Sequence, residues 1–496
     1  MAVKVDTQKE IIFGSSDPNI SRVISKKKKD GELRKLAPRI YTTNLIDSPA
    51  NIVRRNLIEI LAYRYPNALI SHRSAKEMRP TSTGDFFLTN STARRVTDLP
   101  GIILNFVKGP KATAHDIPFM GMHISGEHRY MLENMQLSRK SGDESRVLPI
   151  SVIENKLEQL LLTGGEERLN QYRDELREVA NELGMADEFS KINNIISALL
   201  STHDARVLST DSAKARASGN PFDANRVGLF EILFDTIKDR YFVIRNNRNT
   251  DEDSFRLFSF FESYFSNYIE GTEFDIEEAK EIVDSGIPMP RRDEDSHDIL
   301  GTFKILSNRT EMRRVPTSPE ELFAILSHRH TILLEGRPHM NPGVFKMRNN
   351  RAGQTEFVDY QLVKGTLSQG FKYYSALTDP FARAIFMMFM ISEVHPFNDG
   401  NGRIARVMMN AEFVRADQSR IIVPTVFRED YILALRKFTR HKDPMAYINV
   451  MTKLHQFSDN LYGTDFTELK NYLAACNAYE EPSQAKLQII DRSIRH

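Results

Sequence analysis

The sequence has little or none of several features that mark particular classes of protein. It contains one cysteine, Cys476, so no disulfide can form within the chain, and a reducing, cytoplasmic location is expected. The N-terminus carries no apolar stretch of signal-peptide type. The longest apolar run, Ala384–Ile391, is far too short to span a membrane. We therefore expect a protein without membrane partners.

The chain also lacks a strong net charge. Its 67 Lys and Arg against 66 Asp and Glu leave +1, which gives no electrostatic case for nucleic-acid binding by the protein as a whole. Residues 1–60 differ, because twelve basic and seven acidic residues leave an excess of five positive charges there. The excess of positive charge at this end alone favours binding of a polyanion. The alternative is a small surface lobe on which the run Lys26–Lys29 is simply solvated.

The length and the order of predicted elements divide the chain. At 496 residues it is too long for one ordinary core, so two or three domains are expected. A polar stretch, Ser209–Asn225, is the main predicted boundary. Beyond it the period is helical, apart from a predicted hairpin over Phe345–Leu367. The predicted regions are 1–75, 76–150 (mixed α/β), 151–205 (a helical connector), 206–465 (mostly helical) and 466–496 (a C-terminal tail).

The first region has the pattern of a winged helix. Residues 1–17 read as a flexible lead-in, followed by a short helix over Ser21–Asp30 and a hairpin over Gly31–Thr43. Pro49 after Ser48 is a helix start signal, and that helix is predicted to run to about Tyr65. The order helix, hairpin, helix, with basic residues in the first helix, favours binding of duplex DNA by residues 1–75.

Loose motifs in this part are similar to a known family. Two strands are predicted at Phe86–Thr89 and Ile102–Val107. The runs Leu36–Tyr41, Ala68–Ala75 and Leu99–Gly101 resemble AbiEi-type antitoxin and regulator proteins. The resemblance implies a winged helix before a small mixed domain, over about residues 20–140.

The most informative segment is His395-Pro-Phe-Asn-Asp-Gly-Asn-Gly-Arg-Ile-Ala-Arg406. Its Asp-Gly and Asn-Gly pairs are hairpin signals, and a lone histidine after an apolar helix is usually structural. Both flanks, however, have helical period, with the apolar run Phe381–Val394 before the loop. The segment is therefore predicted to be a helix, a glycine-rich loop and a second helix.

Residue types in this loop suit a polyphosphate. Gly400 and Gly402 permit close backbone approach where a helix begins, and free N–H groups there form an anion site. Two arginines on that helix share a face, and their guanidinium groups are suited to bind a chain of several phosphates. Asp399 is a hard oxygen ligand suited to Mg²⁺. His395 precedes a proline, so its ring turns away at the helix end, where it can accept a proton. The face of the second helix comprises Arg403, Arg406 and Asn410.

The twelve residues match the Fic signature, HPFx(D/E)GNGRxxR, at every specified position. The resemblance implies an all-helical Fic core with a small β-hairpin flap near Thr355–Lys364, which clamps a target segment. It also implies a protein adenylyltransferase that moves AMP from Mg·ATP to a Ser, Thr or Tyr hydroxyl of a target protein, itself included. The implied roles are general base for His395, Mg²⁺ ligand for Asp399, α- and β-phosphate cradle for Gly400, Asn401 and Gly402, and β- and γ-phosphate contacts for Arg403 and Arg406.

A second Fic feature precedes the signature. Ser266-Asn-Tyr-Ile-Glu-Gly271 fits the inhibitory pattern (S/T)xxxE(G/N), within a helix predicted at about 254–270. The alternative is an ordinary helix end capped by Gly271. The resemblance implies that Ser266 and Glu270 are inhibitory, with Glu270 occupying Arg406.

Several alternatives stay open. The loop holds phosphates without reading a base, so another nucleotide or phosphate-linked donor fits equally, and a DNA-binding regulator dominated by the N-terminal module is the rival from another class. His328 and His330 are more readily structural or surface histidines than metal ligands. The methionines at 387, 388 and 390 are predicted to pack in the core. A homodimer is left open. The predicted fold class is mostly α, with an N-terminal α+β region.

Overall fold

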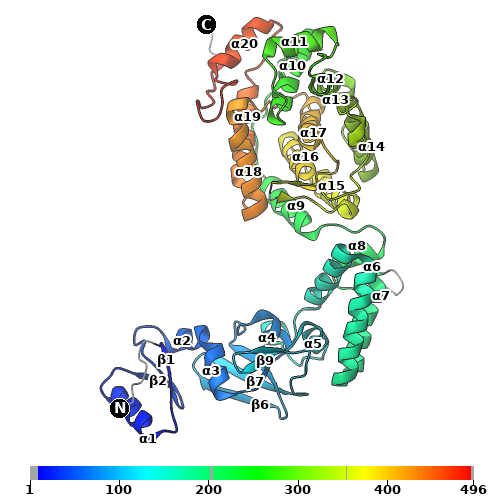
Figure 1. Cartoon of the computed structure of the whole chain (residues 1–496). Coiled ribbons are helices and arrows are strands. Elements are labelled where there is room, and N and C mark those ends of the chain that lie inside the picture. Colours follow the sequence, from blue (N-terminus) through cyan, green and yellow to red (C-terminus); the bar gives the residue numbers. More distant parts are fainter. Residues whose placement is uncertain (1–8, 201–204, 354, 493–496) are drawn as a thin grey trace. The chain divides into compact units, whose positions relative to one another are not determined.

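The computed structural model describes residues 9–200, 205–353 and 355–492, which form two compact units dividing between Ser218 and Gly219. The division falls inside the polar stretch Ser209–Asn225. The first unit contains two β-sheets and several helices, whereas the second is almost entirely helical (Figure 1). The predicted fold class is thus confirmed. No helix of the described residues is long and apolar enough to cross a membrane.

The first unit begins with a three-stranded antiparallel sheet in the order β1-β3-β2. The prediction of a flexible lead-in over residues 1–17 is wrong for residues 11–13, because Ile11 and Ile12 are buried and pair with β3. Residues 1–8 of that lead-in lie outside the described residues. The elements are β1 (Ile11–Phe13), α1 (Pro18–Lys29), β2 (Arg34–Ala37) and β3 (Ile40–Thr42).

The helix predicted from Pro49 to Tyr65 is two helices, α2 (Pro49–Arg55) and α3 (Leu57–Arg64). They break at Asn56, whose side-chain amide donates to the Ile52 carbonyl (2.9 Å) and to Glu10 (2.7 Å). An asparagine side chain that bonds nearby polar groups competes with helix hydrogen bonds. The apolar residues of both helices nevertheless pack into one core, as their spacing predicts.

A six-stranded sheet in the order β6-β7-β5-β4-β9-β8 follows. The two predicted strands lie within β5 and β7, which pair in parallel at its centre. The remaining elements of the unit are β4 (Leu69–Ile70), α4 (His72–Glu77), β5 (Asp85–Asn90), β6 (Arg94–Leu99), β7 (Ile102–Lys108), β8 (Ile117–Phe119), β9 (Met122–Ile124), α5 (Glu127–Glu133), α6 (Ile150–Leu183), α7 (Ala186–Leu199) and α8 (Asp211–Ala217). Residues 201–204 of the predicted connector lie outside the described residues.

The second unit is built around two helices that lie side by side in its middle, α16 (Pro380–Val394) and α17 (Asn401–Arg415) (Figure 1). Met387, Met388 and Met390 of α16 are fully buried, so the methionines fill the core. The surrounding helices are α9 (Ala224–Ile237), α10 (Glu252–Ile269), α11 (Ile276–Ser285), α12 (Asp293–Leu306), α13 (Arg309–Met312), α14 (Pro319–Leu333), α15 (Val363–Ala376), α18 (Arg428–His441), α19 (Met445–Ser458) and α20 (Phe466–Ala475). Residues 493–496 of the predicted tail lie outside the described residues.

The hairpin predicted over Phe345–Leu367 is much shorter in the structure. Only β10 (Arg351–Ala352) and β11 (Thr355–Glu356) pair, around Gly353 with its φ of +60°. The chain turns helical at Tyr360 and α15 begins at Val363, so Lys364 is helical rather than part of a strand. The apolar residues after Val358 pack into the helical core, which overrides their strand propensity. Gln354 lies outside the described residues.

Candidate active site

His395 ends α16 in the left-handed conformation, with a φ of +52° that few residues other than glycine adopt. Its ring stacks on Phe357 at 3.6 Å between centroids, and its Nδ1 lies 3.2 Å from the Ser392 carbonyl. A carbonyl only accepts, so Nδ1 carries the proton and Nε2 keeps a free lone pair. Burial lowers the pKa of His395 to about 4, which keeps the imidazole neutral at pH 7.

The loop after His395 is braced by its own asparagine. Asn401 donates from Nδ2 to the Phe397 carbonyl (2.9 Å) and accepts from the Phe397 N–H (2.8 Å). Gly400 has a φ of +71°, and a Cβ there would lie 2.9 Å from Leu333. The Asn401 side chain is already bonded to the Phe397 backbone, so it is not the group that would bind an anion. The backbone N–H groups in the first turn of α17 have no intrahelical acceptor and can bind an anion instead.

Glu270 lies over this helix start. A Cβ added to Gly402 would lie 2.2 Å from the Glu270 Oε1, so only glycine lets the carboxylate come this close. The same oxygen accepts from Arg406 Nη2 at 2.6 Å. Arg406 also donates to the Ser266 hydroxyl (2.9 Å) and carbonyl (2.8 Å). The structure therefore brings together four predicted site residues, with a carboxylate at the start of α17, where an anion is expected.

Arg403 faces a different partner from Arg406, although both lie on α17. Its Nη1 is 2.7 Å from Oδ2 of Asp298, a buried carboxylate on α12. Nη1 also donates to the Asn267 side-chain oxygen at 3.3 Å. Sequence analysis did not identify Asp298, because no motif marks it and its partner lies in another helix.

Asp399 stands at the mouth of the loop with 39% of its side chain exposed. Its backbone carbonyl accepts from His330 Nε2 (3.0 Å), while His330 Nδ1 accepts from the Gly343 N–H (2.8 Å). His330 also stacks on Phe397, so it supports the loop as a structural histidine. The exposed His328 lies 3.9 Å from Glu311.

The described residues contain no cluster of three or more histidine, cysteine or acidic side chains placed to hold a metal. Mg²⁺ usually needs only one or two protein carboxylates, because waters and substrate phosphates complete its shell. The exposed carboxylate of Asp399 fits that requirement.

Asn410 is the predicted site residue that the structure does not bring to the loop. Its amide donates to Glu262 (2.7 Å) and to the Ile421 carbonyl (2.8 Å), and its oxygen accepts from the Ile421 N–H (2.8 Å). The side chain is fully buried. Asn410 lies on α17 one turn beyond Arg406, as the helical spacing predicts. Its side chain there hydrogen-bonds within the core of the unit and does not face the loop.

One cavity of about 440 Å³ joins the motif, the end of α10 and the short hairpin. The sequence did not predict that residues of α9 and α18 line this cavity, because these residues belong to no motif. The principal lining residues are His395, Gly402, Arg406, Glu270, Phe357, Arg226, Glu393, Tyr431, Ile432, Leu435 and Thr439.

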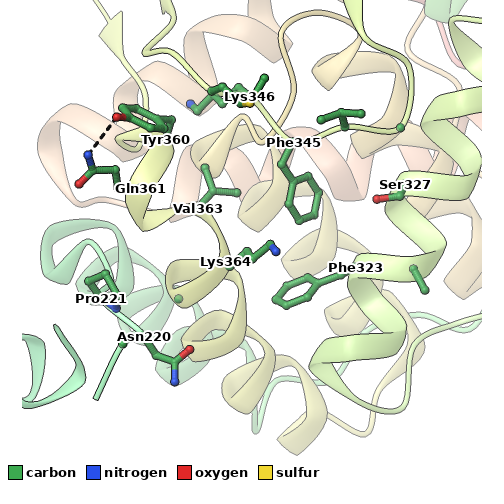
Figure 2. A pocket seen from close by; sticks show the side chains of 16 residues that line it. Asn220, Pro221, Phe323, Ser327, Phe345, Lys346, Tyr360, Gln361, Val363 and Lys364 are labelled. Carbon is green, nitrogen blue, oxygen red and sulfur yellow. Dashed lines mark hydrogen bonds between the residues drawn. The ribbon is translucent and has the colours of Figure 1, made fainter. Parts of the chain in front are cut away.

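A larger cavity of about 670 Å³ lies elsewhere in this unit (Figure 2). Figure 2 shows Phe323, Phe345 and Lys364 around it. None of the residues of the loop from His395 to Arg406 lines it. The chemistry that the sequence predicts therefore belongs to the smaller cavity.

Residues 318–412, which include α14 to most of α17, match the model of the Fic/DOC family. The chain therefore contains a Fic domain, as the signature predicts. It is similar to protein adenylyltransferase fic-1 of Caenorhabditis elegans, at 40% identity over 62 residues, which are 12% of each chain. Protein adenylyltransferase Fic of Nematostella vectensis is 24% identical over 214 residues, covering 40% of this chain and 47% of the relative. The chain thus spans less than half the length of these relatives.

Solved structures of Fic proteins also resemble this one. Fic-1 from C. elegans gives a TM-score of 0.36 at 17% identity, covering 66% of this chain and 92% of that chain. A Fic family protein from Desulfovibrio desulfuricans G20 gives 0.36 at 17% identity, covering 52% and 76%.

Proposed function

We propose that this protein is an adenylyltransferase that transfers AMP from Mg·ATP to a Ser, Thr or Tyr hydroxyl of a target protein, and that Glu270 holds it in a low-activity state. The observation that carries the proposal is the shared cavity. A neutral histidine lies in it beside a helix start that is suited to an anion, and the carboxylate of Glu270 stands at that start, paired with Arg406. The names of the relatives support the same class of reaction.

The residues of the cavity divide the reaction between them. His395 Nε2 takes the proton of the target hydroxyl, whose oxygen bonds to the α-phosphorus of ATP. The bond from that phosphorus to the oxygen bridging to the β-phosphate breaks, and pyrophosphate leaves. The N–H groups at the start of α17 hold phosphate oxygens and stabilise the charge that develops. Asp399 is placed to hold Mg²⁺, which would neutralise phosphate charge when bound.

The mass that the enzyme adds to a target peptide identifies the group transferred, and hence the donor. The Glu270→Gly variant is incubated with a cell lysate and ATP, GTP, CTP or UTP in turn, and modified peptides are identified by mass spectrometry. Addition of AMP to a hydroxyl residue supports the proposal. Addition of another nucleotide or a phosphate-linked group would favour the same fold with a different donor. Modification by none of the four would reject nucleotidyl transfer from these donors.

Asp399→Ala should shift the Mg²⁺ dependence of transfer. We expect about 10-fold more Mg²⁺ at half-maximal rate, because a hard oxygen ligand at the loop mouth is lost. The measurement is a Mg²⁺ titration of pyrophosphate release in the Glu270→Gly background. Asp417→Ala is the matched control, because Asp417 is an exposed carboxylate just after the far end of α17. Identical titrations for the two variants would remove Asp399 from the metal site.

We also infer a second function, duplex DNA binding by the N-terminal unit. Arg22, Lys26 and Lys29 recur at helical spacing on α1, and all three are exposed and form no ion pair with the described residues. The strands β2 and β3 follow this helix directly. A basic helix face followed by a hairpin suits a phosphate backbone. DNA binding would localise the enzyme on DNA without altering the reaction that it catalyses.

In a gel shift, the full chain should bind a DNA duplex at low salt and release it as salt rises. Replacing Arg22, Lys26 and Lys29 together by glutamate should weaken binding by at least about 10-fold, because three phosphate contacts are lost. The matched control replaces Lys364, Lys372 and Lys437 of the second unit by glutamate. Equal affinity of the two triple variants would count against α1 as the DNA contact.

A further inference from the structure

The carboxylate of Asp298 lies between two arginines in the second unit. Its Oδ1 accepts from Arg337 Nε (3.0 Å), and its Oδ2 accepts from Arg337 Nη2 (2.7 Å). The Nη1 of Arg403 lies 2.7 Å from the same Oδ2. The side chain of Asp298 is only 2% exposed and that of Arg403 only 3%. Charge-assisted bonds of this length in a buried site fix the geometry of the groups they join.

Arg403 is held from one side only. Its Nη2 is 3.6 Å from Asp399 Oδ2, which is too long for a hydrogen bond. Its Nε is buried and has no hydrogen-bond partner in the described part of the chain. A buried donor without an acceptor is costly, and native proteins leave few of them. Arg403 follows Gly402 in the first turn of α17, the helix start where phosphate is proposed to bind.

The two carboxylates that meet the motif arginines differ in burial. The Glu270 side chain, paired with Arg406, is 32% exposed at the edge of the cavity. Asp298 is enclosed and shared by two guanidinium groups, so moving it would leave the buried guanidinium of Arg403 without its counter-charge. Glu270 can therefore move aside when a nucleotide enters, whereas Asp298 stays in place.

We propose that Asp298 is a positioning residue for the nucleotide, because it fixes Arg403 so that the free side of that guanidinium meets a phosphate oxygen. Arg337 completes the arrangement by fixing Asp298 through two bonds. This inference rests on the proposed nucleotidyl transfer and extends it to a residue on α12, outside the signature loop.

The test uses the full chain in the Glu270→Gly background and compares Asp298→Asn with Asp295→Asn. Asp295 is the matched control, because it lies on the same helix and 3.7 Å from Arg337, but is not among the hydrogen-bond and ion-pair partners of Arg403 in the described part of the chain. The readouts are the Kd of Mg·ADP by calorimetry, the KM and kcat for ATP by pyrophosphate release, and the Tm. Asp298→Asn should raise both Kd and KM by about 10-fold and change kcat less, since it loosens binding of the phosphates. Asp295→Asn should leave Kd and KM unchanged.

A double-mutant cycle separates positioning from general stability. Arg403→Ala combined with Asp298→Asn should bind ADP no more weakly than Arg403→Ala alone, because Asp298 acts through Arg403. Additive losses would overturn the proposal, and so would a lowered Tm with unchanged Kd and KM. If Asp298→Asn does not fold, Arg337→Gln replaces it, with an expected rise in Kd of about 3-fold; an unchanged Kd there overturns the proposal. A Glu270→Gly parent that binds no ADP would overturn the proposed function itself.

Discussion

Replacing Glu270 by glycine should raise protein labelling from α-labelled ATP by about 100-fold. Glu270 follows the last residue of α10, and a carboxylate at a helix C-terminus opposes the helix dipole. The 2.6 Å bond to Arg406 offsets that cost. The same bond occupies a guanidinium that we propose binds the nucleotide, and the carboxylate lies over Gly402. Phosphates entering beside it would be displaced from in-line attack, and small displacements of reacting atoms cost large factors in rate.

The measurement compares automodification of the wild type and Glu270→Gly at equal protein and Mg²⁺. Glu273→Gly is the matched control, because Glu273 is an exposed carboxylate three residues along the chain and, within the described residues, neither hydrogen-bonds nor ion-pairs with Arg406. A thermal shift gives an independent reading. Glu270→Gly should unfold at a lower temperature without nucleotide, since Arg406 is then buried without its counter-charge, and should gain more from Mg·ATP. Labelling at or below the wild-type level in a folded variant would reject the inhibitory role.

The second large effect concerns His395. In the Glu270→Gly background, His395→Ala should lower the transfer rate by about 1000-fold, because the general base is lost. Nucleotide binding should survive, since in the proposed mechanism the phosphates are held by the start of α17 and by arginines. The measurements are transfer rate and Mg·ADP affinity for the same variant. His328→Ala, an exposed histidine on α14, is the control and should transfer normally. Transfer by His395→Ala at the parent rate would remove His395 from the mechanism.

The pH dependence follows from the same histidine. Burial lowers the pKa of His395 to about 4, so its neutral, base-competent form predominates above that pH and is lost below it. The transfer rate of Glu270→Gly should therefore stay nearly constant from about pH 6 to 8 and fall only under more acidic conditions. A rate that falls by half near pH 6.5 would show an imidazole with an ordinary pKa.

Sequence predictions succeeded where the signal was local. The helices on either side of the glycine-rich loop, α16 and α17, lie where the apolar period placed them, and the family match confirms the Fic domain. The short hairpin before α15 was predicted too long, because apolar residues near Val363 are compatible with both strand and helix. Strand β1 was missed, because three residues give too short a pattern to recognise.

The sequence by itself determined which residue types stand in the loop and at what spacing, and from these twelve positions it predicts a proton acceptor, an anion site and a hard ligand. It also paired Glu270 with Arg406, through the resemblance. Only the tertiary structure decided that Asp298 faces Arg403, that the Asn401 side chain braces the loop, and that Asn410 serves the core. Helical period says which face a residue occupies. The partner across that face comes from a distant segment, and packing of the helices selects it.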